Sequence, residues 1–304
     1  MFATILGPYP RPAGLDDEAA LDLALADQLD ANLGMLADGR SEPDADPLAA
    51  WRVADARARS LAAARGIDPR PVKARVLGPY TAARSPAGTA AARERTTLAA
   101  AEAGNLVLRS LLAAGAPVVQ VEEDGLTAVG ADDEAERRLA ADALRRLTDG
   151  VEGHLSLSVA GGDPCGAGGG VLYGAPFSSH LFDLIRGPDG WRVAREAPRE
   201  RGLILGVADC RTEEPDEEAV TLWAARYAAS IGARGLERVA LAPSAGLEAL
   251  TREAARRKLA DLAGAAVLAG LADAATLREG VDFRALTRTA PPGRAPAPRR
   301  RRSR

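Results

Sequence analysis

Short apolar segments alternate with longer stretches rich in Ala, Arg and Glu along most of the chain, and this alternation constrains the fold most. Several short segments, such as LILGVAD and PVVQVEE, are nearly continuous apolar runs, which is typical of strands buried on both faces of a parallel sheet. The eight predicted strands are Ala3–Tyr9, Gly34–Asp38, Lys73–Pro79, Pro117–Glu123, His154–Ala160, His180–Ile185, Leu203–Asp209 and Arg238–Pro243. Helical periodicity predicts helices that include Leu15–Leu33, Thr89–Ala114, Glu134–Thr148, Glu217–Ile231 and Leu247–Leu262.

Strands that alternate with helices indicate βαβ units and a parallel sheet. Eight of them favour a closed (β/α)8 barrel of the TIM type, which needs about 250 residues as one unit. No GxGxxG motif opens a helix after a strand, so the main reason to prefer an open, doubly wound sheet is missing. We predict one barrel over residues 1–286 and a disordered, Pro- and Arg-rich basic tail over 287–304.

Composition excludes several classes of function. The formal charge is −3, but six arginines lie between Arg294 and Arg304, so the rest of the chain carries −9. An acidic body with only 4% aromatic residues makes nucleic-acid binding an unfavoured reading. The sequence has no apolar run of the roughly 18 residues that a membrane helix needs, and its N-terminus lacks the features of a signal peptide. Cys165 and Cys210 indicate no disulfide framework, so we expect a cytoplasmic protein with a small-molecule substrate.

Polar residues recur where the predicted strands end. Active sites of (β/α)8 barrels lie at the C-terminal ends of the strands, so these residues are the candidates for a binding mouth. Because neighbours on a strand point in opposite directions, at most Glu122 and Asp124 of the run Glu122–Asp124 share one side. The candidates for proton transfer are Glu122, Asp124 and Asp209, and those for substrate binding are Tyr9, Asp38, Arg40, Tyr80, Thr81 and Ser244.

Six segments at or near the predicted strands together resemble the catalytic domain of cobalamin-independent methionine synthase. ILGPYPRP resembles the opening strand motif of that family, LADGRSEPD its DGE segment, and VLGPYTAAR its GP-x-T segment. VVQVEEDGL is similar to QIDEP-x-L, LGVADCRT to a G-V-x-D stretch, and ALAPSAGLEALTREAARRKL to NPDCGL followed by A-x-x-K-L. The resemblance covers about residues 3–262. It implies a methyltransferase that moves a methyl group from a methyltetrahydrofolate-type donor, held by this chain or by a separate partner protein, to a homocysteine-like thiol.

The resemblance also implies a zinc site made by a His, two Cys and a Glu, and here the sequence departs from the family. Ala245 stands at one cysteine position. The H-x-C motif falls on His154 and Ser156 or on Ser158 and Ala160, depending on the register, and Asp183 is the carboxylate nearest to the Glu position. A complete zinc site is therefore not expected, and a site rebuilt from His154, Asp183 and Cys210 is the alternative.

The amino-acid pocket that the resemblance implies is altered as well. Arg40, Glu122 and Pro8 occupy the positions that grip the substrate in the family. An arginine in the mouth would favour a carboxylate, although Arg40 could equally be a surface residue that pairs with Glu42 or Asp44. Three hypotheses follow: a methyltransferase with an altered acceptor, a zinc-free decarboxylase-like or carboxylate-binding enzyme, and a catalytically idle barrel with a binding or regulatory role.

Overall fold

A computed structural model of the chain describes residues 1–41, 46–84 and 89–271. Its core is one sheet of seven parallel strands in the order β1-β7-β6-β5-β4-β3-β2. The strands are β1 (Phe2–Ala3), β2 (Ala74–Leu77), β3 (Val119–Glu122), β4 (Leu155–Val159), β5 (Ser179–Asp183), β6 (Gly202–Ala208) and β7 (Val239–Pro243). The chain is therefore an α/β protein with a TIM-type barrel, as the alternating pattern predicts.

The segment between β1 and β2 joins the two edges of this sheet. Thr4 forms a parallel bridge with Met35, and Leu36 forms one with Val72. The backbone amide of Lys73 also donates to the carbonyl of Leu36 at 2.9 Å. The eighth predicted strand, Gly34–Asp38, thus lies where the sequence places it. It is reduced to two bridges because Gly39, with a φ of +68°, turns the chain away directly after it.

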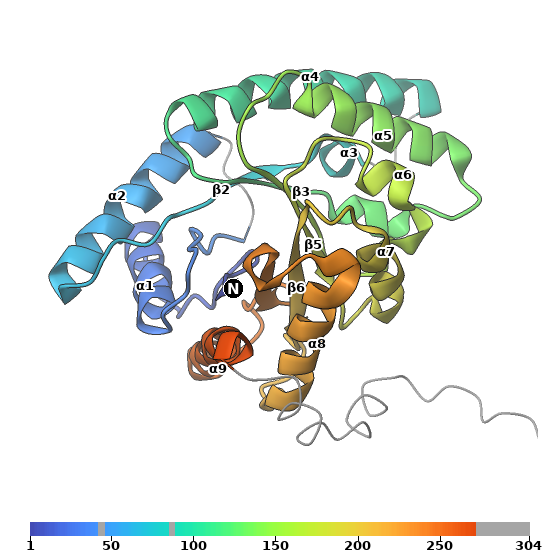
Figure 1. Ribbon diagram of the computed structural model, residues 1–304. Helices are drawn as coiled ribbons and strands as arrows, with labels where there is room; N and C mark the ends of the chain where they lie inside the picture. Colours follow the sequence, from blue (N-terminus) through green and yellow to red (C-terminus); the bar gives the residue numbers. More distant parts are fainter. Residues whose placement is uncertain (42–45, 85–88, 272–304) are drawn as a thin grey trace, which may run out of the picture.

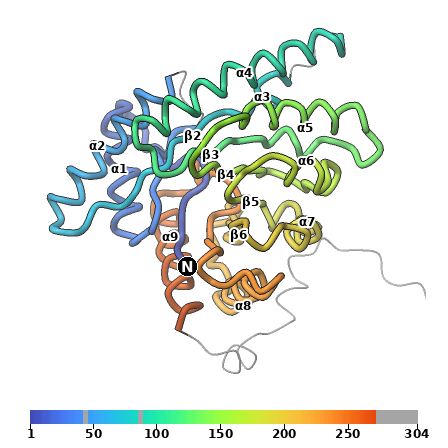
Figure 2. Tube along the Cα trace, turned by 45° about the horizontal axis from the view of Figure 1, so that its top comes forward, coloured from blue at the N-terminus to red at the C-terminus, as the bar shows by residue number. Residues whose placement is uncertain are grey.

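Helices surround the sheet on its outer side (Figure 1). They are α1 (Asp17–Asp30), α2 (Pro47–Arg65), α3 (Pro79–Ala82), α4 (Ala90–Ala113), α5 (Glu134–Thr148), α6 (Gly169–Leu172), α7 (Trp191–Glu196), α8 (Glu218–Ser230) and α9 (Arg252–Leu271). Figure 2 shows that α9 lies beside the N-terminal strand, so elements from the two ends of the barrel sequence pack together. This contact is what the closure of a barrel requires.

Local sequence explains where the long helices begin and end. Asp16, Thr89 and Asp133 each accept a hydrogen bond from a backbone amide in the first turn of α1, α4 and α5. Helix α2 starts with Pro47 directly after its cap and ends at Gly66, which adopts a left-handed conformation with a φ of +64°. Four of the five helices that the sequence predicts, now α1, α4, α5 and α8, are confirmed to within a few residues, and three of them carry a capping side chain that is visible in the sequence.

Several boundaries differ from the sequence-based expectation. The predicted first strand, Ala3–Tyr9, is reduced to Phe2–Ala3 with a bridge at Thr4. The predicted helix Leu247–Leu262 begins only at Arg252 and runs on to Leu271, because residues 247–250 form a turn after β7. The sequence analysis did not single out α2 as a helix. The predicted tail over 287–304 and the boundary at residue 286 lie outside the described residues.

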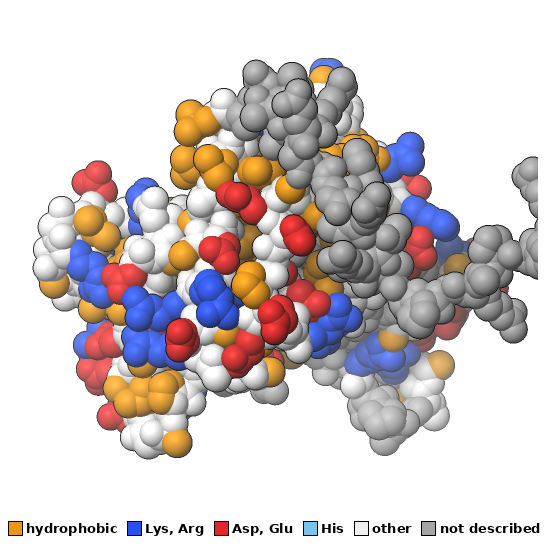
Figure 3. Space-filling model, turned by 90° about the horizontal axis from the view of Figure 1, so that it is seen from below, with side chains coloured by type: hydrophobic (Ala, Val, Ile, Leu, Met, Phe, Trp, Pro, Cys, Tyr) orange, Lys and Arg blue, Asp and Glu red, His pale blue; other side chains and the backbone are white. Residues whose placement is uncertain are grey.

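The surface of the described part carries charges of both signs. Figure 3 shows Lys and Arg side chains interspersed with Asp and Glu side chains over one face, rather than a field of one sign. Within residues 1–41, 46–84 and 89–271, none of the helices has the length and apolarity that crossing a bilayer requires.

Alternating side chains of each strand face the barrel interior, and this interior has two unlike sides. Leu6, Leu181, Ala242 and the partly buried Ile204 form an apolar cluster together with Ala160. The side formed by β2, β3 and the lower part of β4 is polar instead. The interior positions on that side are Lys73, Arg75, Gln120, Glu122, Ser156 and Ser158.

Candidate active site

A buried ion-pair network lies inside the barrel near the C-terminal ends of β2 and β3. Arg75 donates from Nε and Nη2 to the two carboxylate oxygens of Glu122, at 2.7 and 3.1 Å. Its Nη1 donates to Asp38 Oδ1 at 2.9 Å and to the carbonyl of Arg40 at 2.7 Å. Burial alone lowers the pKa of Arg75, but Glu122 and Asp38 outweigh it and raise that pKa. Arg75 is therefore a permanent cation that holds two carboxylates in fixed positions.

Lys73 and Gln120 lie next to this network in the interior. Gln120 Nε2 donates to Glu122 Oε1 at 2.8 Å. Lys73 Nζ donates to the carbonyl of Ile5 at 2.5 Å. Burial, followed by the repulsion from Arg75, lowers the pKa of Lys73 to about 7. The ammonium group of Lys73 thus titrates near neutral pH, whereas the guanidinium group of Arg75 stays charged.

Asp124 is the carboxylate that the mouth leaves most open. It directly follows β3, and the residue as a whole is exposed, whereas Glu122 is partly buried. Asp124 Oδ1 accepts a hydrogen bond from the backbone amide of Ala160 at 2.8 Å. Surrounding protein atoms desolvate the carboxyl, and the charges of Glu122 and Asp183 add to this effect, so that the pKa of Asp124 rises to about 6. A carboxylate with this pKa can accept a proton near neutral pH.

Asp183, at the end of β5, is fully buried and holds two loops in place. Its oxygens accept hydrogen bonds from the backbone amides of Ile185, Arg186 and Gly161, at 2.9, 2.9 and 3.2 Å. Burial raises the pKa of Asp183, against the effect of these amides. Asp183 therefore lines the mouth, but backbone amides already donate hydrogen bonds to both of its carboxylate oxygens.

Glu123 points away from the mouth, into the loop that follows β2. It accepts hydrogen bonds from the backbone amides of Tyr80 and Thr81, at 3.0 and 2.8 Å, and from Thr81 Oγ1 at 2.6 Å. A Cβ on Gly78 would lie 2.1 Å from the Glu123 carboxyl carbon, so this approach requires glycine. Side chains at 122 and 123 therefore face opposite ways, as the alternation along a strand predicts.

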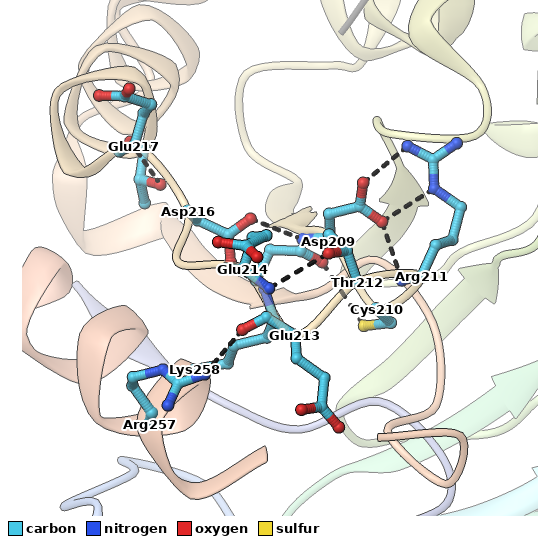
Figure 4. Close-up of polar contacts among 12 residues, drawn as sticks. Asp209, Cys210, Arg211, Thr212, Glu213, Glu214, Asp216, Glu217, Arg257 and Lys258 are labelled. Carbon is cyan, nitrogen blue, oxygen red and sulfur yellow. Dashed lines mark hydrogen bonds and ion pairs between the residues drawn. The ribbon is translucent and has the colours of Figure 1, made fainter. Parts of the chain in front are cut away.

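The loop that follows β6 forms another part of the rim (Figure 4). Arg211 pairs with Asp209 through Nε and Nη2, at 2.8 and 2.7 Å. Asp216 Oδ1 accepts from the backbone amide of Asp209 at 2.9 Å, and Asp216 Oδ2 pairs with Lys258 Nζ of α9 at 3.0 Å. Lys258, which is completely buried, also donates to the carbonyl of Glu214. Helix α9 thus fixes the loop that positions Asp209 and Arg211.

The donors proposed for a rebuilt metal site are not brought together. His154 precedes β4 at the N-terminal end of the barrel, where its Nε2 lies 2.9 Å from Ser179 Oγ. Asp183 and Cys210 lie at the C-terminal ends of β5 and β6. Among residues 1–41, 46–84 and 89–271, no three His, Cys, Asp or Glu side chains are grouped as metal ligands would be. The donor set of the described residues does not fit zinc.

Cys210 lies beside Ala245, the residue that stands at a zinc-cysteine position of the family that the sequence resembles. Its Sγ is 3.3 Å from the carbonyl oxygen of Ala245, and it is also in contact with Ser244, which is buried. Burial raises the pKa of the Cys210 thiol, which disfavours the thiolate that a metal would need. The thiol is therefore a packed side chain in this arrangement.

Three of the residues predicted to bind substrate face the helices rather than the mouth. Tyr9 Oη donates to the buried carboxylate of Asp27 in α1, at 2.9 Å. Tyr80 Oη donates to Glu136 of α5 at 2.6 Å, and Thr81 is engaged by Glu123. These side chains follow the strand ends, but the turns after the strands rotate them outward.

Arg40 lines a surface cavity of about 350 Å³ together with Tyr9, Arg11 and Asp17. Residues of α1 and Asp38 of the Arg75 network also line this cavity, so it adjoins the mouth on the side of α1. The backbone carbonyl of Arg40 accepts a hydrogen bond from Arg75 of the network. Residues 42 and 44, the acids considered as its partners, lie outside the described residues. The structure therefore places Asp38, Glu122, Asp124, Asp183, Asp209 and Ser244 at the mouth, and the Arg40 side chain beside it.

Sequence reasoning missed three cations of the barrel interior and the mouth, Lys73, Arg75 and Lys258. A signal for Arg75 exists, since KARVL carries charges at alternate positions of an otherwise apolar strand, and such positions share one face. A signal for Lys258 exists as well. Lys73 and Lys258 are the only lysines among 39 basic residues, and both are buried. The two lysines of this arginine-rich chain thus both occupy buried sites, where an ammonium group is more compact than a guanidinium group.

Fold and mouth together define a (β/α)8 barrel with a carboxylate-lined opening at the C-terminal ends of its strands. Such an arrangement can bind a small molecule and transfer a proton. No protein-family model matches this chain, and no curated protein does so either.

Solved structures with the same fold are similar to this chain over most of its length. One is a B12-independent methionine synthase from Shewanella sp. W3-18-1 in complex with selenomethionine, with a TM-score of 0.71 at 15% identity, covering 88% of this chain and 97% of that one. Another is a Listeria monocytogenes protein proposed to be a vitamin-B12-independent methionine synthase, with a TM-score of 0.66 at 12% identity and the same two coverages. A methyltransferase from Methanosarcina mazei has a TM-score of 0.53 at 17% identity and covers 86% of this chain and 70% of its own. At these identities the likeness shows the fold.

Proposed function

We propose that this chain is a methyltransferase of the methionine synthase type that activates its acceptor with a carboxylate instead of zinc. The observation that carries the proposal is Asp124, a carboxylate with a raised pKa at the open mouth of a barrel whose fold matches methionine synthases. The absence of cysteines from both positions of the zinc motif, together with the dispersed His154, Asp183 and Cys210, favours chemistry without zinc.

The acceptor in this proposal is a small amino-acid thiol of the homocysteine type. Glu122 and Asp124 give the mouth a negative side that suits an ammonium group, whereas Arg211 at the rim suits a carboxylate. Arg75 neutralises part of the charge of Glu122 and keeps it in position. Asp124 is thus the carboxylate that is best placed to meet the reacting group.

The proposed reaction balances in one displacement. The thiol proton passes to the Asp124 carboxylate, and the resulting thiolate attacks the methyl carbon of a methyltetrahydrofolate-type donor. The S–C bond forms while the C–N bond of the donor breaks, and the nitrogen then takes up a proton. A base with a pKa of about 6 is largely ionised at neutral pH, so Asp124 can accept the thiol proton while the sulfur attacks and can return it to the nitrogen of the leaving group.

Methyl transfer from methyltetrahydrofolate to homocysteine, followed by mass spectrometry of methionine, tests the proposal. We expect Asp124→Asn to lower the rate by roughly 10²- to 10⁴-fold and to abolish the rise of activity as the pH increases through about 6. Asp142→Asn is the matched control, because Asp142 lies on the outer surface of α5 and pairs with Arg145. Equal rates for the two variants would remove Asp124 from the mechanism.

A catalytically idle barrel is the second candidate. The closed Arg75 network favours it, because each polar group of Arg75 and Glu122 already has a partner within the protein. An idle barrel binds homocysteine or the folate without turnover, and Asp124→Asn then changes affinity alone. The zinc-free, carboxylate-binding reading is less favoured, since it depends on Arg40, which lines a cavity formed mainly by α1 and the segment that precedes it.

A further inference from the structure

A second cavity lies at the opposite, N-terminal end of the barrel interior. Its volume is about 370 Å³, and its wall contains residues from the starts of all seven strands. Barrels of this fold normally fill their interior with layers of large branched side chains. Here small residues occupy several of the lowest interior positions, namely Ser156, Ser179, Gly202 and Ala240. The sequence thus leaves space where the fold usually has a packed layer.

Two polar atoms of this wall have no hydrogen-bond partner among the described residues. They are Gln120 Oε1 and Ser156 Oγ, and both are buried. The orientation of the Gln120 amide is fixed, because its Nε2 donates to the Glu122 carboxylate, so its oxygen is left to accept. A buried polar group without a partner is energetically unfavourable. A bound molecule that donates to Gln120 and accepts from Ser156 would remove this cost.

The charges around the cavity select an uncharged head group. Burial lowers the pKa of His154, which therefore stays neutral near pH 7. Lys73 is a weak cation whose Nζ is already used by the carbonyl of Ile5. Glu200 and Glu237 line the cavity together with Arg238, so no single sign dominates. The rest of the wall combines the polar residues Thr4, Ser178 and Ser179 with apolar ones that include Phe2, Met35, Val118 and Ile204.

We propose that this cavity is a second binding site, for a small amphiphile with an uncharged head group that both donates and accepts hydrogen bonds, and with a short aliphatic tail. Primary amides and alcohols belong to this class. Even an apolar cavity of roughly 150 Å³ can bind a small organic molecule, so the volume is sufficient. Gln120 lines the cavity and also donates a hydrogen bond to Glu122 at the mouth. A molecule bound in the cavity is therefore linked to the mouth through this one side chain. The proposal does not depend on methyl transfer at the mouth.

Hexanamide is the probe that tests this site on the full chain. The sequence contains only two methionines, Met1 and Met35, and Met35 lines the cavity. With ¹³C-methyl-labelled methionine, we expect hexanamide to shift the Met35 signal to saturation and to leave Met1 unchanged. Contacts between the probe and the Met35 methyl group in the wild-type protein then locate the tail without any variant. A Met35 signal that does not move, or that moves linearly together with Met1, overturns the proposal.

Three variants test how the probe is held. Ser156→Ala should weaken binding about two- to tenfold, the effect of one hydrogen bond, while Ser110→Ala on the surface of α4 should not change it. Ile204→Phe should fill the cavity and abolish the Met35 shift. Unchanged affinity in Ser156→Ala, or retained binding in a folded Ile204→Phe protein, contradicts the proposed mode of recognition.

Discussion

The two ends of the barrel interior differ in whether their buried polar side chains have hydrogen-bond partners. At the C-terminal end, Arg75 pairs with Glu122 and Asp38. At the N-terminal end, Gln120 and Ser156 border a cavity and leave polar atoms without partners among the described residues. Strand β3 contributes to both ends, with Gln120 and Glu122 two positions apart. One strand can therefore serve two environments, because every second residue faces the same interior.

The difference has an energetic consequence. A buried charge that loses its partner is strongly unfavourable, whereas a buried hydroxyl without a partner has no interaction to lose. Substitutions at the mouth should therefore be costly, and substitutions at the N-terminal end should be neutral or stabilising. The predictions below test this contrast, beginning with the largest expected effect.

Arg75→Met should lower the free energy of unfolding by about 3–5 kcal/mol, because it leaves the carboxylates of Glu122 and Asp38 buried without a cation. Urea denaturation followed by tryptophan fluorescence measures the change. Arg57→Met is the control, since Arg57 pairs with Glu18 and Asp22 at the surface and should cost less than about 1 kcal/mol. Similar losses in both variants would show that the mouth network is no stronger than a surface pair.

Glu123 should make stability depend on pH. Burial raises its pKa from 4.5 to about 7, so the folded chain holds this proton more tightly than the unfolded chain. The resulting stabilisation is fully present below pH 4.5 and is lost as the pH rises through 7; it amounts to roughly 3 kcal/mol. Unfolding free energies measured from pH 4 to 8 should fall less steeply in Glu123→Gln. Parallel curves for the two proteins would refute this assignment.

Lys258→Met should destabilise the fold by about 1.5–3 kcal/mol and should expose the loop after β6 to cleavage by trypsin at Arg211, because Lys258 anchors Asp216 and Glu214. Arg257→Met is the matched control. Arg257 contacts the same loop from the same helix, at Glu213, but it is exposed, so we expect less than about 1 kcal/mol. Equal cleavage rates in the two variants would remove Lys258 as the anchor.

Ser156→Ala should leave the free energy of unfolding unchanged or raise it by up to about 1–3 kcal/mol, since it removes a buried hydroxyl that has no hydrogen-bond partner among the described residues. Thr81→Ala gives the contrast, because Thr81 Oγ1 donates to Glu123 and accepts from the amide of Gly125. We expect it to cost about 1–3 kcal/mol. Thermal and urea unfolding both report the difference, and a large cost for Ser156→Ala would mean that the hydroxyl is hydrogen-bonded.

The strands and the facing of their side chains were predictable from the sequence, because continuous apolar runs mark strands buried on both faces. Alternation also separated Glu122 and Asp124 from Glu123. The turns after the strands were not predictable in this way. Tyr9, Tyr80 and Thr81 follow strand ends, but the turns direct their hydroxyl groups to Asp27 of α1, Glu136 of α5 and Glu123 directly after β3 instead of to a substrate.

The metal candidates failed to assemble for a related reason. His154 was grouped with Asp183 and Cys210 by residue type, but it precedes its strand whereas the other two lie at strand ends, so the height of the barrel separates them. Arg75 and Lys73 were overlooked because charged residues within a strand were not read as interior groups. Their partners, Glu122 and the carbonyl of Ile5, come from distant segments and become neighbours only in the folded barrel.

The central claim is that Asp124, and not zinc, activates the acceptor. It is tested most directly by measuring methyl transfer with purified protein whose zinc content has been determined. We expect methionine to form from homocysteine and methyltetrahydrofolate in protein that contains far less than one zinc per chain, at a rate that a chelator does not change. Zinc near one per chain, with turnover that the chelator abolishes, would contradict activation by Asp124. The absence of turnover in both preparations would contradict the proposed methyltransferase itself.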